Sequence, residues 1–164
     1  MAMKNWLDEY AVWQTGSSLI EIIVATGVLA LVLTALVAGM TVSLRTSAEA
    51  KYRSQAIKRG QEAMEVFRRE RTLLGWDVFS GQFSSGSTYC LQELPAPKTS
   101  FAVGQCTSAQ SLAVSGIDLY RQAVVAVDNT NPTDPQVKVV VSVTWDSGQG
   151  ERGVDLTQVF RQWN

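Results

Sequence analysis

Few residues of this chain could carry out chemistry, because its 164 residues include no histidine and two cysteines, Cys90 and Cys106. Without histidine the chain lacks the commonest general base and metal ligand, which argues against zinc sites and against Ser-His or Cys-His catalysis. The two cysteines lie in a segment rich in Gly, Ser and Thr. They could form a disulfide that contributes about 3 kcal/mol in the loop-entropy model, or they could remain free thiols in a reducing compartment.

A second group of potential ligands consists of oxygen-bearing side chains close together in the chain. The group comprises Asp128, Asn129, Asn131 and Asp134. These oxygens could hold Ca²⁺, but Asx-rich turns next to proline are more often plain hairpin connections. We therefore expect no metal ion, no cofactor and no enzymatic activity. The net charge of −1 also argues against a dedicated nucleic-acid-binding protein, so we expect no nucleic-acid partner.

A long uncharged stretch follows Glu21, which is the only charged residue between Ser17 and Leu44. Its length matches the about 20 residues that a helix needs to cross a membrane. A carboxylate near the centre of a bilayer costs on the order of 3 kcal/mol, so Glu21 requires a partner or a position near the interface. A secretory signal peptide fits less well, because the apolar run is long, the leader has one base and no small-x-small cleavage site stands out. The sequence therefore predicts a membrane helix over residues 17–44.

The helix can continue beyond the membrane segment, because no proline precedes Pro95. Apolar and small residues recur there at intervals of three and four, which predicts an amphipathic continuation over residues 45–74. The stripe comprises Ala56, Ile57, Gly60, Ala63, Met64, Phe67, Arg71 and Leu74. A helix of this length exceeds what a bilayer needs, so the amphipathic part must pack against another element.

Residues 75–164 have the pattern of a small β domain with loops. Alternating, β-branched segments predict strands at Leu119–Asp128, Gln136–Asp146 and Gly153–Phe160, with a shorter strand near Tyr89–Leu91. In the second strand one face is apolar, formed by Val137, Val139, Val141, Val143 and Trp145. That face needs a cover, which the amphipathic helix can supply. The predicted fold class is α+β: a long N-terminal helix, membrane-spanning in its first half and amphipathic in its second, packed on a small antiparallel β-sheet.

The residues before the apolar run, Gly16-Ser17-Ser18-Leu19-Ile20-Glu21, resemble the class III signal of type IV prepilins and type II secretion pseudopilins. The resemblance implies that a prepilin peptidase cuts between Gly16 and Ser17, that Ser17 becomes the N-methylated first residue, and that Glu21 is the acid used in assembly. Residues 1–16 would then be the leader. The first mature residue departs from the family pattern, which usually has Phe or another apolar residue there.

Two later segments are also similar to minor pilins: SQAIKRGQEAMEVFRRER before Gly75-Trp76, and the terminal VKVVVSVTWDSGQGERGVDLTQVFRQW. The resemblance implies a non-enzymatic minor pilin or pseudopilin of a type IV pilus-like or type II secretion filament. Its partners would be the prepilin peptidase, other pilin or pseudopilin subunits, an inner-membrane assembly platform and, before assembly, membrane lipid. The β domain, residues 75–164, would lie outside the cytoplasm, in the periplasm or at the cell surface.

Three observations leave alternatives open. The positive-inside rule points to the opposite orientation, because Arg45, Lys51 and Arg53 follow the apolar run while Lys4 is the one base before it. Ser18 and Glu21 also fit an S-x-x-E capping box of an ordinary helix start, although that would leave the long helix unexplained. A single-pass membrane protein with an exported binding domain and no filament role is the alternative function.

Overall fold

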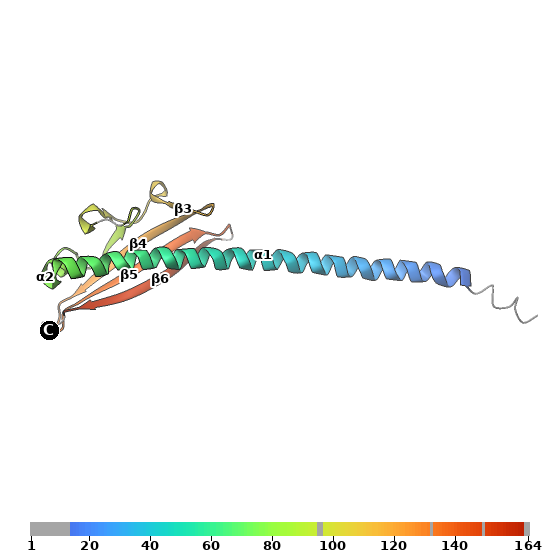
Figure 1. Ribbon diagram of the computed structural model, residues 1–164, viewed down its shortest axis with the longest axis horizontal. Coiled ribbons are helices and arrows are strands. Elements are labelled where there is room, and N and C mark those ends of the chain that lie inside the picture. Colours follow the sequence, from blue (N-terminus) through green and yellow to red (C-terminus); the bar gives the residue numbers. More distant parts are fainter. Residues whose placement is uncertain (1–13, 95–96, 132, 149, 163–164) are drawn as a thin grey trace, which may run out of the picture. The chain divides into compact units, whose positions relative to one another are not determined.

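The computed structural model describes residues 14–94, 97–131, 133–148 and 150–162. It has the predicted α+β class, with one long helix and an antiparallel sheet (Figure 1). The chain divides into two compact units, Met1–Ala48 and Glu49–Asn164. Helix α1 (Gln14–Leu74) contributes to both: its first part belongs to the first unit, and its second part is the main helix of the second unit.

Helix α1 ends at Leu74 because the next residue, Gly75, has a φ of 74°. This left-handed conformation favours glycine and is common just after a helix. The Gly75 N–H donates to the carbonyl oxygen of Arg71 at 3.2 Å, which satisfies one of the last carbonyls of the helix. A short helix, α2 (Trp76–Gly81), follows where the sequence predicted a loop, because a segment of six residues is too short to show a helical period.

Six strands form one antiparallel sheet in the order β2-β1-β4-β5-β6, with β3 paired to β4. The strands are β1 (Ser87–Cys90), β2 (Ala102–Val103), β3 (Leu112–Val114), β4 (Ile117–Asp128), β5 (Gln136–Asp146) and β6 (Glu151–Arg161). The three long strands predicted from the sequence are confirmed. The sequence predicted neither β2 nor β3.

The turn between β3 and β4 consists of Ser115 and Gly116, which have φ values of 52° and 88°. Positive φ at both central residues is the mark of a type I′ turn, which joins antiparallel strands tightly. Val114 therefore pairs directly with Ile117 in the register of the two strands. Ser115 also accepts a hydrogen bond from Gln55 of α1 at 2.8 Å, so the turn is tied to the helix.

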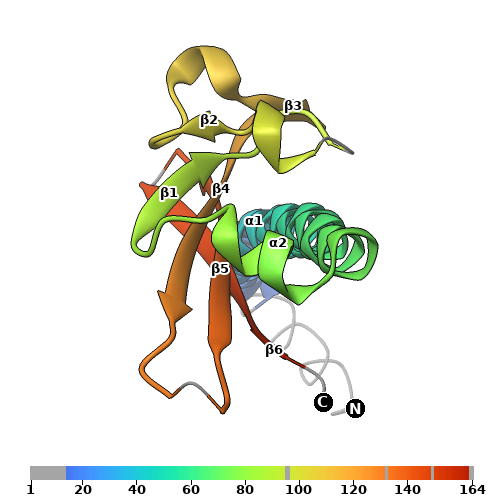
Figure 2. The ribbon, with the colours of Figure 1, turned by 90° about the vertical axis from the view of Figure 1, so that its left-hand side faces the viewer.

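The core lies between α1 and one face of the sheet, and Figure 2 shows the helix almost end-on against that face. The predicted apolar face of β5 is buried: its four inward valines are 0% exposed and Trp145 is 2% exposed. Gly60 of α1 lets the helix approach β6, because a Cβ there would lie 2.5 Å from Cδ1 of Leu156. The ring of Phe67 packs between those of Phe83 and Phe101, and its centre lies 5.9 Å from the centre of each.

The buried side of α1 ends earlier than the sequence predicted. Ala56, Ala63 and Phe67 are 0% exposed, as a helical stripe requires, but Leu74 is 40% exposed. The aromatic residues of α2 and β6 fill the end of the core instead, with Phe79 and Phe160 at 5.3 Å between ring centres. Leu74 continues the spacing of the stripe, but the chain turns into α2 just after it, and the spacing of apolar residues does not reveal this turn.

Candidate functional site: an uncovered apolar helix and a tethered loop

The first part of α1 presents apolar side chains that no described residue covers. From Leu19 to Leu44, fifteen large apolar side chains are exposed, by 50% or more in every case. Soluble proteins rarely expose an apolar surface of this extent. By length and composition the helix could cross a membrane, and none of its most apolar stretch is buried.

The threonines of this segment satisfy their hydroxyl groups within the helix. The hydroxyls of Thr26, Thr34 and Thr41 each donate to the carbonyl oxygen four residues earlier, at 2.9, 3.0 and 2.6 Å. A hydroxyl bonded in this way needs no partner outside the helix. The segment can therefore be transferred into an apolar environment without leaving these polar groups unpaired.

Glu21 is the one charged residue of this segment, and its carboxylate has no hydrogen-bond or ion-pair partner among the described residues. Glu21 and Gly39 lie on the same face of the helix, because at about 100° per residue the chain completes a whole number of turns between them. Ala35 and Gly39 form a small-xxx-small pair on this side, and such pairs let two helices approach closely. The predicted cleavage residues Gly16 and Ser17 fall within α1, and the side chain of Ser17 lies outside the described part of the structure.

The predicted disulfide between Cys90 and Cys106 is present, with the Cα atoms 4.9 Å apart. It joins the end of β1 to the loop that follows β2. Lys98 lies on the enclosed segment, and its Nζ is 5.6 Å from the ring centre of Phe83 and 5.4 Å from that of Tyr89. The bridge and these cation–π contacts hold the loop against the aromatic core.

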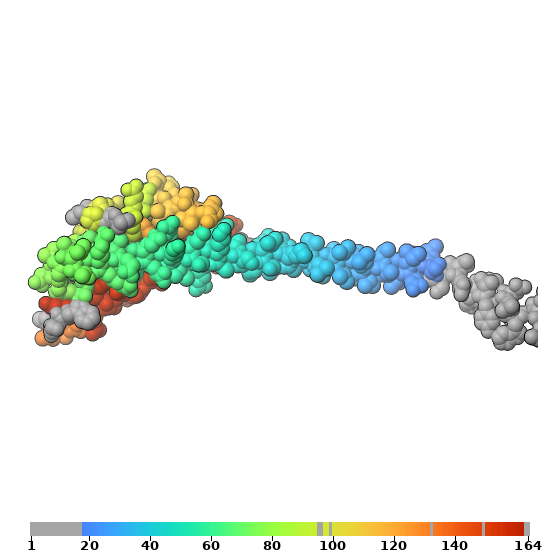
Figure 3. Space-filling model, viewed as in Figure 1, coloured from blue at the N-terminus to red at the C-terminus, as the bar shows by residue number. Residues whose placement is uncertain are grey.

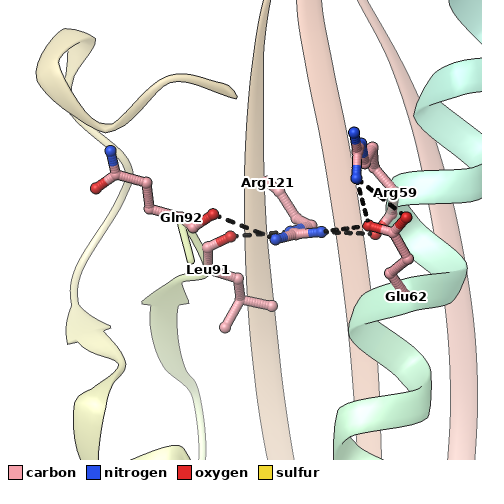
Figure 4. A network of polar contacts seen from close by, with 5 residues as sticks. All are labelled: Arg59, Glu62, Leu91, Gln92 and Arg121. Carbon is pink, nitrogen blue, oxygen red and sulfur yellow. Dashed lines mark hydrogen bonds and ion pairs between the residues drawn. The ribbon is translucent and has the colours of Figure 1, made fainter. Parts of the chain in front are cut away.

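A buried arginine connects this loop to α1 (Figure 4). Arg121 of β4 is 3% exposed, and its guanidinium donates to the carbonyl oxygens of Leu91 at 2.8 Å, Gln92 at 3.3 Å and Arg59 at 3.1 Å. It also lies 3.5 Å from Oε2 of Glu62, which Arg59 contacts at 2.9 Å. One side chain thus joins the loop after β1, the central strand β4 and the helix.

The electrostatics of this network are unfavourable for the charge of Arg121. Burial lowers the pKa of Arg121 from its usual value to about 10, although the nearby Glu62 carboxylate raises it and Arg59 lowers it further. Desolvation therefore outweighs the attraction of the carboxylate. The carbonyl hydrogen bonds compensate for this cost, because each replaces a bond to water.

Sequence reasoning missed Arg121 as an important residue, although a signal was present. Arg121 shares one face of β4 with Leu119, Ala123 and Val125, which are 0% exposed and face the helix. A charged residue in phase with an apolar face is a candidate for a buried, hydrogen-bonded group. Its partners could not be read from the sequence, because two of them are backbone carbonyls of an irregular loop.

The Asx-rich loop between β4 and β5 uses its oxygens for its own turns. Oδ1 of Asp128 accepts from the Thr130 N–H at 3.0 Å and hydroxyl at 2.6 Å, and Asn131 accepts in the same way from Thr133. The hydrogen bonds from Thr130 lower the pKa of the Asp128 carboxyl. Within the described ranges no cluster of three or more His, Cys, Asp or Glu side chains could hold a metal ion. This geometry is that of a hairpin connection.

A groove of about 540 Å³ lies between the last turns of α1 and the end of the edge strand β6. Its lining residues are Arg68, Arg71, Thr72, Gln158, Val159, Phe160, Arg161 and Gln162. Arg68 donates to Gln158 at 2.9 Å, and Arg71 donates to the carbonyl oxygen of Arg161. The groove is therefore lined by arginines that already hold the helix to the strand.

Comparison with known proteins finds no match to a family model, to a curated protein or to a solved structure. The described geometry places the chain in the class of α+β proteins with one N-terminal helix long and apolar enough to span a membrane. This arrangement is consistent with a single-pass membrane protein.

Proposed function

We propose that this protein is a minor pilin or pseudopilin: a filament subunit that a prepilin peptidase processes and that assembles through its N-terminal helix. The observation that carries the proposal is α1 itself, because its uncovered apolar first part, with Glu21 as the single charged residue between Leu19 and Leu44, continues without a break into the helix of a β domain. The sequence Gly16 to Glu21 at its start supports the same proposal through its resemblance to the prepilin signal.

The exposed apolar surface supports a subunit that is first held in the membrane and is later packed against the helices of other subunits in a filament. Burying a large apolar side chain stabilises by about 1.5–3 kcal/mol, so the fifteen exposed ones between Leu19 and Leu44 represent on the order of 20 kcal/mol or more. In the membrane, lipid covers this surface. In a filament, the helices of neighbouring subunits cover it, and the pair Ala35 and Gly39 allows them to pack closely.

Glu21 gives the proposed assembly its dependence on processing. In the core of a helix bundle an unpaired carboxylate is costly, so Glu21 must find a cation there. The amine created at Ser17 by cleavage after Gly16 is such a cation, on the same or a neighbouring subunit. An uncleaved chain lacks this amine, and its Glu21 would remain unpaired.

The disulfide supports an exported β domain. Disulfides form and persist in oxidising compartments and are rare in the cytosol, and Cys90 and Cys106 are joined in this protein. Export would place the domain in the periplasm or at the cell surface. We weigh this above the distribution of Lys and Arg around the apolar segment, which favours the opposite orientation.

The decisive experiment combines N-terminal mass and filament incorporation in cells that carry the assembly genes and the prepilin peptidase. Intact mass should show loss of residues 1–16. Glu21→Ala should insert and be cleaved normally but should be lost from sheared filaments, whereas the matched control Glu49→Ala, outside the apolar segment, should be incorporated normally. Normal incorporation of Glu21→Ala would contradict the pairing, and a retained leader would contradict the filament subunit itself.

The second candidate function is a single-pass membrane protein that carries an exported binding domain. The groove between α1 and β6, with its three arginines, is the observation that favours it. A binding module of this kind would retain residues 1–16 and would be absent from the filament fraction. The same two measurements therefore separate the candidates.

A further inference from the structure

Within the second unit, charges of opposite sign lie on opposite layers. The solvent-facing side of α1 carries three exposed bases whose side chains have no hydrogen-bond or ion-pair partner among the described residues. They are Lys51, Lys58 and Arg69, which share one side of the helix, opposite the buried Ala63 and Phe67. The acids nearby, Glu62 and Glu65, are already paired with other arginines of the same helix. We call the surface formed by these three bases the cationic helix surface.

The opposite side of the sheet is acidic. The residues of β4, β5 and β6 that face away from α1 include five carboxylates and two bases. The carboxylates are Asp118, Asp128, Asp146, Glu151 and Asp155, and the bases are Lys138 and Arg161. Arg161 is also paired with Asp134, at 3.3 Å. We call this face of the sheet the acidic sheet surface.

The register makes part of this acidic surface unfavourable in an isolated molecule. Asp146 lies directly opposite Glu151, and Asp155 follows on the same face of β6. Like charges directly opposite on neighbouring strands are destabilising. These side chains do not form a metal site, since the described residues contain no cluster that could hold a metal ion. A surface of positive charge would relieve the repulsion.

The two charged surfaces cannot meet within one molecule. Figure 2 shows α1 on one side of the sheet and no described helix on the other, and Figure 3 shows the surface of α1 from the outside. The charges are complementary, and both surfaces belong to the same chain. We propose that the cationic helix surface of one copy binds the acidic sheet surface of a second copy of this chain.

Such a contact joins two different surfaces, so each copy retains one free surface of each kind. Contacts of this heterologous type extend into open chains when the rotation between copies does not close a ring. The inference rests on the proposed function for its biological role, since a filament subunit needs a repeating contact. The contact itself requires neither cleavage after Gly16 nor the apolar helix.

The test exchanges the signs of the charges on the two surfaces of the full-length protein, which is purified in neutral detergent. Self-association is then measured by sedimentation at low salt. Helix variant Lys51→Glu/Lys58→Glu and sheet variant Glu151→Lys/Asp155→Lys should each self-associate at least about 10-fold more weakly than the wild type. A mixture of the two variants should associate again, because each presents the surface that the other needs. The control Glu93→Lys, an exposed loop position away from both surfaces, should behave like the wild type.

A chain that carries all four substitutions should also regain self-association, because both signs are exchanged together. Added salt should weaken every one of these contacts, since exposed charges are screened. Failure of both the mixture and the fourfold variant to associate would overturn the proposal, provided that circular dichroism shows folded protein. Wild-type protein that stays monomeric but binds anionic phosphatidylglycerol vesicles through the helix surface would overturn it too. Neither result bears on whether residues 1–16 are removed, which the N-terminal mass decides.

Discussion

Replacing Arg121 with methionine tests whether the loop after β1 is held by carbonyl hydrogen bonds or by the ion pair with Glu62. The guanidinium donates to three backbone carbonyls, at 2.8, 3.1 and 3.3 Å. Hydrogen bonds to a charged group contribute about 1.5–3 kcal/mol each, and the two longer bonds belong at the lower limit. Their loss amounts to about 5 kcal/mol on this scale.

Removal of the buried charge compensates for part of this loss. The fall in the pKa of Arg121 from its usual value to about 10 means that the fold disfavours the charged form by about 3 kcal/mol. Methionine has no such cost and fills much of the same space. We therefore expect Arg121→Met to lower the free energy of unfolding by about 2 kcal/mol.

Glu62→Gln is the matched comparison, because it removes the counter-charge and leaves the carbonyl bonds in place. Glu62 has a side chain 38% exposed and lies 3.5 Å from Arg121, so its loss should cost about 1 kcal/mol or less. Lys138→Met, exposed on the far side of the sheet, should change stability by no more than about 0.5 kcal/mol.

The assay is equilibrium urea unfolding of the full-length protein in detergent, followed by tryptophan fluorescence, to which the buried Trp145 contributes together with the four other tryptophans of the chain. Trypsin cleavage at Lys98 under native conditions reports separately on the loop and should accelerate in Arg121→Met. Equal losses of stability in Arg121→Met and Glu62→Gln would refute the assignment to the carbonyl bonds. An Arg121→Met protein as stable as the wild type would refute the tether altogether.

Two further predictions concern the core and the disulfide. Phe67→Asp should destabilise the domain by about 3–5 kcal/mol, because it buries an unpaired charge and removes a ring that is 0% exposed. Arg68→Asp, on the exposed side of α1, should cost less than about 1 kcal/mol in the same urea titration. Similar losses in the two would mean that the buried face of α1 is misassigned. The double variant Cys90→Ser/Cys106→Ser should lose about 3 kcal/mol of the free energy of unfolding. Reduction of the wild-type protein should expose two additional thiols, and a thiol count that does not rise on reduction would show that no bridge forms in the cell.

Features that depend on neighbours in the chain could be predicted from the sequence. The apolar run before Leu44, the helical spacing through Phe67 and the alternation of β5 each depend on residues a few positions apart. Their physical cause is local: a helix or strand repeats its faces with a fixed period, so the side that must be buried appears as a pattern. The disulfide could be predicted for a different reason: the chain has two cysteines, so one intramolecular pairing exists.

Short elements escaped prediction because they contain too few residues to show a period. The type I′ turn at Ser115 and Gly116 did leave a local signal, a Ser-Gly pair between apolar segments, but β3 has only three residues. Strand β2, with two residues, exists because β1 offers a free edge for it to pair with. Helix α2 likewise packs Phe79 into a core that other elements create.

The sequence by itself determined the class of fold, the candidate membrane segment and the resemblance that motivates the filament proposal. The tertiary structure alone decided that Arg121 joins three elements, where α1 leaves the core, and that bases and acids occupy opposite sides of one domain. The physical reason is distance along the chain: Arg59, Leu91 and Arg121 are brought together by strand pairing and helix packing, and no periodicity in the sequence encodes which residues far apart become neighbours.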